Sequence, residues 1–492
     1  MPSPRQPCVS TYSGSWTVLN SGAGTRGESY SGSVPSTSDT AVVVAHDRAV
    51  GRLRASYELI PPGEPVRLAK RSSNLFRPRA DPGRPGLDVS QLTGVISVDP
   101  AARTADVQGM CTYEDLVAAT LPHGLTPMVV PQLKTITLGG AVTGLGIESS
   151  SFRAGLPHES VLELDILTGA GAVVTARPDG EHADLFRMFP NSYGTLGYAT
   201  RLRIELDRIS PYVALRHVRL GLDALAPAID EIVASGTYDG EPVHFVDGVA
   251  FSPSEAYLTL GRNSDAAVRT SDYTGQQIYY RSIQQRPKDF LTAHDYLWRW
   301  DTDWFWCSAA FGAQKPVVRR LWPRRWRRSD VFHKIVGFEN RHHVAARLNR
   351  RRGQPDRERV VQDVEIPVAR LADFLRWFDT HVGMRPVWLC PLRLRGQESW
   401  PLYPLQPGET YVNVGFWGTV PIAPGAADGD VNRRIEQAVT DFGGHKSLYS
   451  DAYYDRATFD RLYNVAALDE VKKRYDLDAR LTGLYEKAVT RQ

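Results

Sequence analysis

Residues 131–161, PQLKTITLGGAVTGLGIESSSFRAGLPHESV, place a glycine- and serine-rich loop between two apolar stretches. Glycine lets backbone N–H groups point inward at φ values that other residues avoid, and several such groups in succession form a concavity suited to phosphate oxygens. The glycines and flanking hydroxyl groups that fit this use are Gly139, Gly140, Gly144, Gly146, Thr137, Ser149, Ser150 and Ser151. The loop lacks the GK[ST] ending of a P-loop, so γ-phosphate chemistry is excluded. Local sequence leaves two interpretations open, a diphosphate site and a tight structural connection.

Length and composition indicate a globular chain of at least two domains. The 492 residues exceed what one hydrophobic core supports, and 42% of them are hydrophobic. A net charge of +3 does not favour binding to nucleic acid. The four cysteines lie far apart without a C-x-x-C pair, and no run of 18 apolar residues or signal-peptide core occurs. We therefore expect a cytoplasmic protein with reduced thiols and no nucleic-acid partner.

The order of expected elements divides the chain. The N-terminal tail is rich in Ser, Gly and Thr without a sustained period, and its GAGTRG motif at residues 22–27 lacks the amphipathic helix that a dinucleotide site requires. Strand-like runs, beginning with AVVVA at residues 41–45 and including GVISVD at 94–99 and TADVQGM at 104–110, then alternate with turns and with the helical TYEDLVAATLPHG at residues 112–124. The segment SVLELDILTGAGAVVTARP at residues 160–178 predicts a β-hairpin that turns at Gly169–Gly171. We expect an α+β protein in four parts: a flexible tail (1–40), an α+β domain (41–210), a second α+β domain (211–440) and a helical C-terminal segment (441–492).

Two segments resemble the flavin-binding domain of the vanillyl-alcohol-oxidase and p-cresol-methylhydroxylase (PCMH) family. The pattern Pro-x(5)-Thr-x-Gly-Gly occurs at residues 131–140, and NSYGTLGYATRLRIEL at residues 191–206 is similar to the second glycine-rich segment. A loop that carries consecutive glycines in the family reads RLAKRSSNLFRPR here and contains no histidine, which implies FAD bound noncovalently. The implied cofactor contacts are Arg71, Ser72, Ser73, Asn74, Pro131, Gln132, Thr137, Gly139, Gly140, Gly144, Glu148, Ser149, Ser150, Gly194 and Gly197. The resemblance implies a PCMH-type FAD-binding domain of two subdomains, then a substrate domain, then a C-terminal segment that returns to the flavin.

A closer resemblance covers most of the chain from about residue 43. The segments TLGGAVTGLGIESSS, HADLFRMFPNSYGTLGY, RVVQDVEIPV, RPVWLCPL and GHKSLYSDAYYDRATFDRLY follow the order found in the delta-24 sterol reductase group and its bacterial relatives, which include reductases of 10-methylene fatty acyl chains. This resemblance implies an FAD-dependent oxidoreductase that acts on CH–CH groups, saturating an isolated double bond of a lipid with hydride from NADPH. The arginine-rich composition and the lack of an N-terminal apolar span favour a 10-methylene fatty acyl chain, reduced to a 10-methyl branch, over a sterol. The alternatives are a delta-24 sterol-type reductase, an FAD-dependent oxidase of an alcohol or other small substrate, and a flavoprotein without catalytic activity.

The implied reaction needs an acid. An isolated alkene has no carbonyl group to stabilise charge, so a proton must arrive before or with the hydride. Glu148 lies in the glycine loop, where an apolar environment would raise its pKa, although a loop-bracing carboxylate is an equal alternative. Tyr449 and Tyr453 in LYSDAYY flank Asp451, for which we favour pairing with an arginine. The expected catalytic residues are Glu148, Tyr449 and Tyr453.

No metal site is expected. His342 and His343 are adjacent, so on a helix they point in different directions, and no third ligand stands at metal spacing. A surface or packing role is favoured for both histidines.

The segment VVRRLWPRRWRRSDVF at residues 317–332 combines tryptophans with arginines. Indoles prefer the depth of lipid headgroups, and arginines attract anionic lipid. The six arginines are Arg319, Arg320, Arg324, Arg325, Arg327 and Arg328. They predict reversible contact with the inner face of a membrane, with a solvated surface loop as the alternative. Upstream, the aromatic stretch at residues 294–307 predicts either the wall of an apolar substrate tunnel or core.

Overall fold

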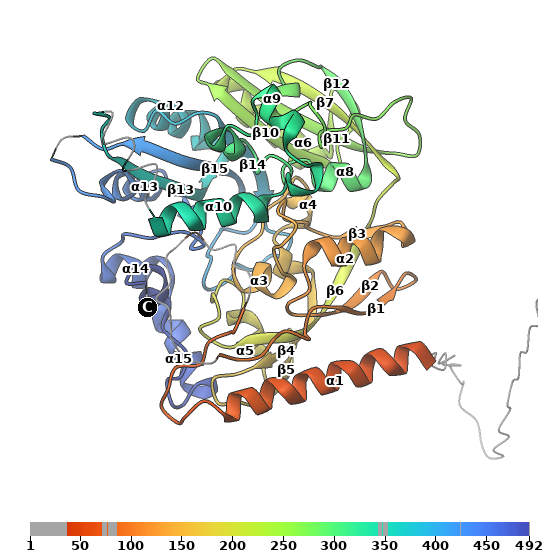
Figure 1. The fold of residues 1–492 in the computed structure, drawn as a ribbon, viewed down its shortest axis with the longest axis vertical. Coiled ribbons are helices and arrows are strands. Elements are labelled where there is room, and N and C mark those ends of the chain that lie inside the picture. The colour runs from red at the N-terminus through yellow and green to blue at the C-terminus, as the bar shows by residue number, and fades with distance from the viewer. Residues whose placement is uncertain are drawn as a thin grey trace, which may run out of the picture.

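The computed structural model describes residues 37–70, 76, 86–342, 347, 353–423 and 425–491. These residues form two large antiparallel sheets, one in each domain, and a separate two-stranded sheet, which together with the helices confirms the predicted α+β class. In Figure 1 the first sheet lies below the second, and the glycine-loop helix α3 lies between them.

The first sheet has the order β1-β2-β6-β4-β5, with β3 paired to β6. Its elements are β1 (Val95–Asp99), β2 (Thr104–Gln108), β3 (Leu125–Pro127), β4 (Val161–Leu167), β5 (Val173–Ala176) and β6 (Tyr198–Arg208), with α2 (Tyr113–Thr120), α3 (Leu138–Thr143), α4 (Ser151–Ala154) and α5 (Ala183–Met188). Alternation of apolar and polar residues predicted β1 and β2, and the Gly169–Gly171 turn predicted the β4–β5 hairpin. These strand predictions are confirmed.

The strand prediction for AVVVA is wrong. Residues 41–45 lie in α1 (Thr37–Glu58), a helix that runs along the outer side of the first domain (Figure 1). Three consecutive valines favour a strand locally, but Ala49 and Leu53, spaced four residues apart, are buried on one face of the helix, and this packing overrides the local preference. Residues 37–40, which we expected in the flexible tail, also belong to α1. Residues 1–36, which include the GAGTRG motif, lie outside the described residues.

The second sheet has eight strands in the order β12-β7-β11-β10-β14-β15-β13-β16. Its strands are β7 (Tyr212–Leu220), β10 (Phe245–Ser252), β11 (Glu255–Ser264), β12 (Lys288–Thr292), β13 (Arg357–Pro367), β14 (Val387–Arg393), β15 (Thr410–Pro421) and β16 (His445–Lys446). The domain also contains β8 (Thr237–Tyr238), β9 (Glu241–Pro242), α6 (Leu222–Ser235), α7 (Tyr279–Ser282), α8 (Ala293–Leu297), α9 (Pro316–Leu321), α10 (Ser329–His342), α12 (Leu371–His381) and α13 (Asp430–Asp441).

The two faces of this sheet differ. Val360 and Val364 of β13 and Val414 of β15 pack in a core with residues of α6 and α12. Because side chains alternate along a strand, Asp363 and the other intervening residues of β13 and β15 point to the opposite face, toward the first domain. Polar side chains on buried strands are therefore brought to the boundary between the domains.

The C-terminal segment crosses back to the first domain. After β16 pairs with β13, the chain forms α14 (Arg456–Leu462), α15 (Val465–Tyr475) and α16 (Leu484–Ala488), of which α14 and α15 lie at the lower left of Figure 1. Lys472 Nζ donates to the carbonyl of Thr195 at 3.1 Å, and Lys487 Nζ donates to that of Gly194 at 2.9 Å. The last residues of the chain thus hold the second glycine-rich segment.

Candidate functional site

A cavity of about 660 Å³ lies between the glycine loop and the second sheet. This size is typical of a small-molecule site, which spans roughly 300–1,000 Å³. Its loop side includes Pro131, Gln132, Thr137, Gly139, Gly140, Gly144, Tyr193 and Gly194. Its other walls include Phe76, Trp304, Phe305, Asp363, Trp388, Asn413, Trp417, Ser447, Tyr449, Thr482 and Lys487. One wall is therefore rich in glycine, and the other is rich in aromatic side chains.

The glycine loop is positioned by close contact between backbones. The N–H group of Gly139 donates to the carbonyl of Gly109 at 2.9 Å, and a Cβ atom on Gly139 would lie only 2.6 Å from that oxygen. Thr137 caps α3 by accepting from the N–H group of Gly140 at 3.3 Å, and Lys70 Nζ donates to the same hydroxyl at 3.2 Å. Glycine at position 139 and a cation beside the loop are what a bound diphosphate requires.

The second glycine-rich segment packs against the first. The N–H group of Tyr193 donates to the carbonyl of Thr143 at 2.6 Å, and Gly194 has a φ of +76°, a value that glycine adopts without strain. Gly197 has a φ of +136° and does not line the cavity; a Cβ atom there would overlap the carbonyl of Leu167. Gly194 therefore forms part of the cavity wall, whereas Gly197 allows close packing within the first sheet.

The predicted cofactor contacts fall into three groups. Seven line the cavity: Pro131, Gln132, Thr137, Gly139, Gly140, Gly144 and Gly194. Four do not, namely Glu148, Ser149, Ser150 and Gly197. The remaining four, Arg71, Ser72, Ser73 and Asn74, lie outside the described residues.

Glu148 is committed to a buried ion pair. Arg299 Nη2 donates to Glu148 Oε1 at 2.8 Å and to Asp247 Oδ2 at 2.9 Å, and the hydroxyl of Ser149 donates to Glu148 at 2.7 Å. Gln132 donates a further hydrogen bond to the same carboxylate. Burial and the charge of Asp247 raise the pKa of Glu148, while Arg299 lowers it. These contacts favour the loop-bracing interpretation of Glu148 over that of a proton donor.

The two predicted tyrosines occupy different places. Tyr449 lines the cavity, and its hydroxyl accepts from Trp417 Nε1 at 2.8 Å. Burial raises the pKa of Tyr449 well above its usual value. Tyr453 does not line the cavity and lies next to Arg433, whose guanidinium carbon is 5.3 Å from the ring centre. Asp451 forms an ion pair with Arg359 at 2.8 Å, which confirms its predicted arginine partner.

Sequence reasoning missed two polar residues of the cavity wall. Asp363 of β13 and Asn413 of β15 both line the cavity, and Asn413 Nδ2 donates to Asp363 Oδ1 at 3.1 Å. Asn413 Oδ1 is buried and has no hydrogen-bond partner among the described residues. Such an acceptor fits a ligand that carries an N–H group. The available signal was weak: Asp363 is one of several polar residues in the segment RVVQDVEIPV, and Asn413 stands between two valines in ETYVNVGFWGTV.

The aromatic segment at residues 294–307 serves both predicted roles. Trp304 and Phe305 line the cavity, whereas Trp300 stacks on Phe305 from the core with ring centres 4.9 Å apart. Among the described residues there is no group of three or more His, Cys, Asp or Glu side chains that could hold a metal ion, and His343 lies outside those residues.

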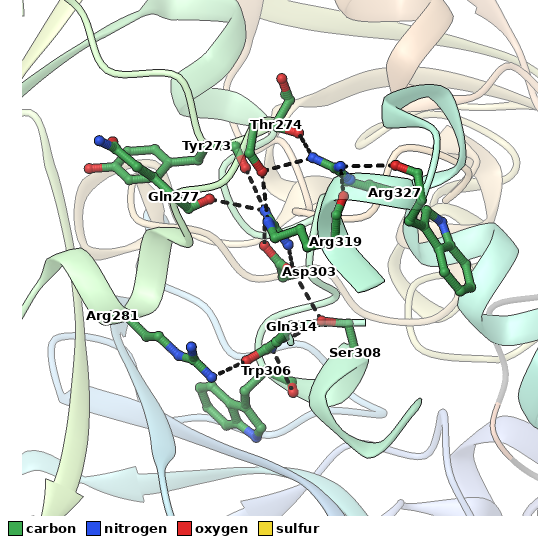
Figure 2. Close-up of polar contacts among 12 residues, drawn as sticks. Tyr273, Thr274, Gln277, Arg281, Asp303, Trp306, Ser308, Gln314, Arg319 and Arg327 are labelled. Atoms are coloured by element: carbon green, nitrogen blue, oxygen red, sulfur yellow. Dashed lines mark hydrogen bonds and ion pairs between the residues drawn. The ribbon is translucent and has the colours of Figure 1, made fainter. Parts of the chain in front are cut away.

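The arginine-rich segment divides into buried and exposed residues. Arg319, 2% exposed, pairs with Asp303 at 2.6 Å and donates to backbone carbonyls of residues 273–277. Arg327, 7% exposed, donates to the carbonyl of Gly275 at 2.8 Å. Figure 2 shows both guanidinium groups turned inward onto this loop. The prediction of lipid contact is therefore wrong for Arg319 and Arg327.

The outer side of the same segment is basic and apolar. Arg328 is half-buried against Glu114, while Arg320, Arg324 and Arg325 are exposed. Large apolar side chains lie exposed beside them: Val317 (71%), Leu321 (77%) and Trp326 (50%). Within the described part of the chain, no helix has the length and apolar character needed to cross a bilayer.

Comparison with known proteins shows which enzymes this chain is similar to. Residues 63–177 match the FAD binding domain family. Delta(24)-sterol reductase of Arabidopsis thaliana is 25% identical over 446 residues, covering 82% of this chain and 76% of the relative. Delta(24)-sterol reductase of Homo sapiens is 25% identical over 412 residues, covering 80% and 76%. Cytokinin dehydrogenase 6 of Oryza sativa subsp. japonica is 40% identical over 189 residues, covering 38% of this chain and 30% of the relative.

The residues of the cavity fit an FAD molecule. Gly139 and Gly140 line the cavity without side chains, the Lys70 ammonium group lies beside the loop, and the orphaned carbonyl oxygen of Asn413 can accept from a ring N–H group. Of the described residues that line the cavity, none is His or Cys, and residues 71–75 and 77–85 contain neither residue type in their sequence. A noncovalent cofactor is the arrangement that these residues favour.

Proposed function

We propose that this chain, which has a PCMH-type FAD-binding domain, reduces an isolated carbon–carbon double bond of a lipid. The premise is its distant homology to the delta(24)-sterol reductases over most of its length. Electrons come from NADPH in this proposal. The first domain binds FAD and the second domain binds the lipid. The observation that carries the proposal is the pairing of a glycine-backbone wall with an aromatic wall across one cavity.

Each wall suits one ligand. We propose that Pro131, Gln132, Thr137, Gly139, Gly140, Gly144 and Gly194 contact FAD, and that Arg71, Ser72, Ser73 and Asn74 contact its diphosphate. When bound, FAD supplies the hydride that reduces the alkene. Trp304, Phe305, Trp388 and Trp417 offer the apolar surface that an alkyl chain or a sterol ring system requires. These side chains also exclude water from the reacting carbon atoms.

Two lipid classes share the required chemistry. A delta(24)-unsaturated sterol and a 10-methylene fatty acyl chain both carry a double bond remote from any carbonyl group. In both, protonation of the less substituted carbon leaves the hydride for the more substituted one. The curated relatives support the sterol-type reaction more strongly, so we place it first and the 10-methylene fatty acyl chain second.

Anaerobic half-reactions test the proposal. NADPH is expected to bleach the visible absorbance of the bound flavin, because the reductase reaction begins with reduction of that flavin. A delta(24)-unsaturated sterol or a 10-methylene fatty acyl phospholipid should restore the absorbance, and the matching saturated lipids should not. Comparison of the two unsaturated lipids identifies the substrate class. A flavin that resists NADPH but is bleached by an alcohol and reoxidised by oxygen would instead identify an oxidase.

We also propose that the protein docks reversibly on anionic membranes through residues 315–326. Residues 315–328 contain seven basic and no acidic residues, and Leu321 and Trp326 protrude among exposed arginines. The buried side chains of Arg319 and Arg327 fix the segment against the loop at residues 273–277, so docking costs little ordering entropy. A lipid substrate gives such a surface its use.

Vesicle sedimentation tests the docking. We expect Arg320→Gln combined with Arg325→Gln to weaken binding to phosphatidylglycerol-containing vesicles by about 2 kcal/mol, roughly 30-fold, since each surface arginine contributes about 1 kcal/mol. The matched control, Arg48→Gln with Arg54→Gln on α1, removes two exposed arginines elsewhere and should bind as the wild type does. Equal binding to neutral and anionic vesicles would contradict the proposal.

A further inference from the structure

Asp363 occupies an unusual position for a carboxylate. It lies in the middle of β13, on the face of the second sheet that meets the first domain, and its side chain lines the cavity across from the glycine loop. The neighbouring residues Val360 and Val364 belong to the hydrophobic core on the other face. An acidic side chain among buried strands is costly unless it has a use.

The surrounding residues hold the carboxyl group in place. Asn413 Nδ2 donates to Asp363 Oδ1 at 3.1 Å, and the hydroxyl of Tyr449, which also lines the cavity, lowers the pKa of the same carboxyl group. Gly415 is the direct cross-strand partner of Asp363, and a Cβ atom there would lie 2.5 Å from Asp363 Oδ1. A glycine at this position gives the carboxyl group the room that it occupies.

We propose that Asp363 is the proton donor of the reaction, with Tyr449 as the residue that positions its carboxyl group. This role rests on the proposed function. Among the acidic side chains described, Asp363 is the one that lines the cavity, since Glu148 lies outside it and is paired with Arg299. Tyr449 is oriented in turn by Trp417, whose Nε1 atom donates to the tyrosine hydroxyl at 2.8 Å.

The same proton transfer from Asp363 applies to both lipid classes. The O–H bond of the Asp363 carboxylic acid breaks, and its proton forms a C–H bond with the less substituted alkene carbon as the π bond opens. The more substituted carbon, left short of an electron pair, receives the hydride that FAD supplies after reduction by NADPH. Asp363 is left as a carboxylate and regains a proton from solvent before the next turnover.

The buried surroundings bring the pKa of this acid closer to neutral pH. Burial raises the pKa of Asp363 to about 6, and the hydrogen bonds from Asn413 and Tyr449 hold it from rising further. Burial also raises the pKa values of the neighbouring groups Tyr449, Glu365 and Cys390 well above their usual values. The acid is thus poised close to the operating pH, as an efficient general acid requires.

The test separates the two half-reactions of Asp363→Asn. Reduction of the flavin by NADPH should match the wild type, because no proton donor to carbon takes part. Reoxidation by the unsaturated lipid should slow by about 10²–10⁴-fold, the usual contribution of a general acid. Wild-type reoxidation should decline as the pH rises through about 6, where Asp363 loses its proton, and reoxidation of the variant should be independent of pH there.

The matched control is Glu365→Gln. Glu365 lies two residues along the same face of β13, accepts a hydrogen bond from the hydroxyl of Tyr403 and does not line the cavity, so this variant should keep both half-reactions. Infrared difference spectra provide a readout that does not depend on turnover. A protonated-carboxyl band should disappear between pH 5 and pH 7 in the wild type and be absent from Asp363→Asn.

The outcomes are distinguishable. A wild-type flavin that NADPH reduces but no unsaturated lipid reoxidises overturns the proposed function and this inference with it. Reoxidation of Asp363→Asn at the wild-type rate overturns this inference alone. Should the variant fail to fold, the wild-type pH profile still decides, because reoxidation that is unaffected between pH 5 and pH 7 contradicts an acid with the pKa of Asp363.

Discussion

Replacing Arg299 with leucine will destabilise the folded protein by about 3–5 kcal/mol at pH 7, the usual cost of removing one partner from a buried ion pair. Arg299 is the cation between two buried carboxylates, with Glu148 Oε1 at 2.8 Å and Asp247 Oδ2 at 2.9 Å. Glu148 ends the glycine loop and Asp247 belongs to β10, so this cation also joins the two domains. Denaturant unfolding followed by circular dichroism measures the loss.

The loss of unfolding free energy caused by Arg299→Leu should be larger at high pH than at low pH. Burial and Asp247 already raise the pKa of Glu148, and removing Arg299 removes the effect that opposes them. The folded variant then binds a proton that the unfolded chain releases, so its stability falls as the pH rises through the raised pKa of Glu148. The deficit should be smaller at pH 5 than at pH 8. The exposed control Arg320→Leu should change stability by less than about 0.5 kcal/mol.

Gly139→Ala will weaken retention of FAD by about tenfold or more and destabilise the first domain by about 1–3 kcal/mol, the usual cost of overpacking. Its Cβ atom would lie 2.6 Å from the backbone carbonyl oxygen of Gly109, too close for a real contact, so the backbone of one of the two residues must shift. Gly109 is itself pressed against Ala199 of β6. The strain therefore displaces the loop that lines the cavity.

Flavin content after gel filtration and thermal unfolding measure the two effects of Gly139→Ala. Gly51→Ala on α1 is the matched control, because Gly51 is also helical but has no atom within 4 Å of the position that an added methyl group would take. We expect the control to keep its flavin and to gain up to about 1 kcal/mol of stability. Full flavin occupancy in Gly139→Ala would show that the loop does not form part of the cofactor site.

Local patterns were sufficient for most of the fold. Strand-like runs predicted β1 and β2, a glycine-containing turn predicted the β4–β5 hairpin, and a 3.6-residue period predicted α2. The run AVVVA was misassigned because its helix is stabilised by contacts of Ala49 and Leu53 with distant parts of the chain. Those contacts cannot be inferred from the sequence of the five residues alone.

The sequence predicted the glycine loop that lines the cavity, but it did not predict the polar residues of the second sheet on the other wall. Motifs such as Pro-x(5)-Thr-x-Gly-Gly are contiguous, so the loop could be found from sequence. The role of Glu148 depends on Arg299, 151 residues further along the chain, and no spacing rule joins them. Asp363 stood within the quoted segment RVVQDVEIPV, and its significance came only from the cross-strand positions of Asn413 and Gly415.

The C-terminal crossing sets the order in which the protein can be made. Thr482 and Lys487 line the cavity, and Lys487 holds the carbonyl groups of Tyr193 and Gly194. A growing chain on the ribosome lacks these contacts until residues 482–487 emerge, although the FAD-binding domain is synthesised first. The complete cavity can therefore form only after Thr482 and Lys487 have been synthesised, and a chain that stops before Thr482 would lack part of the cavity wall.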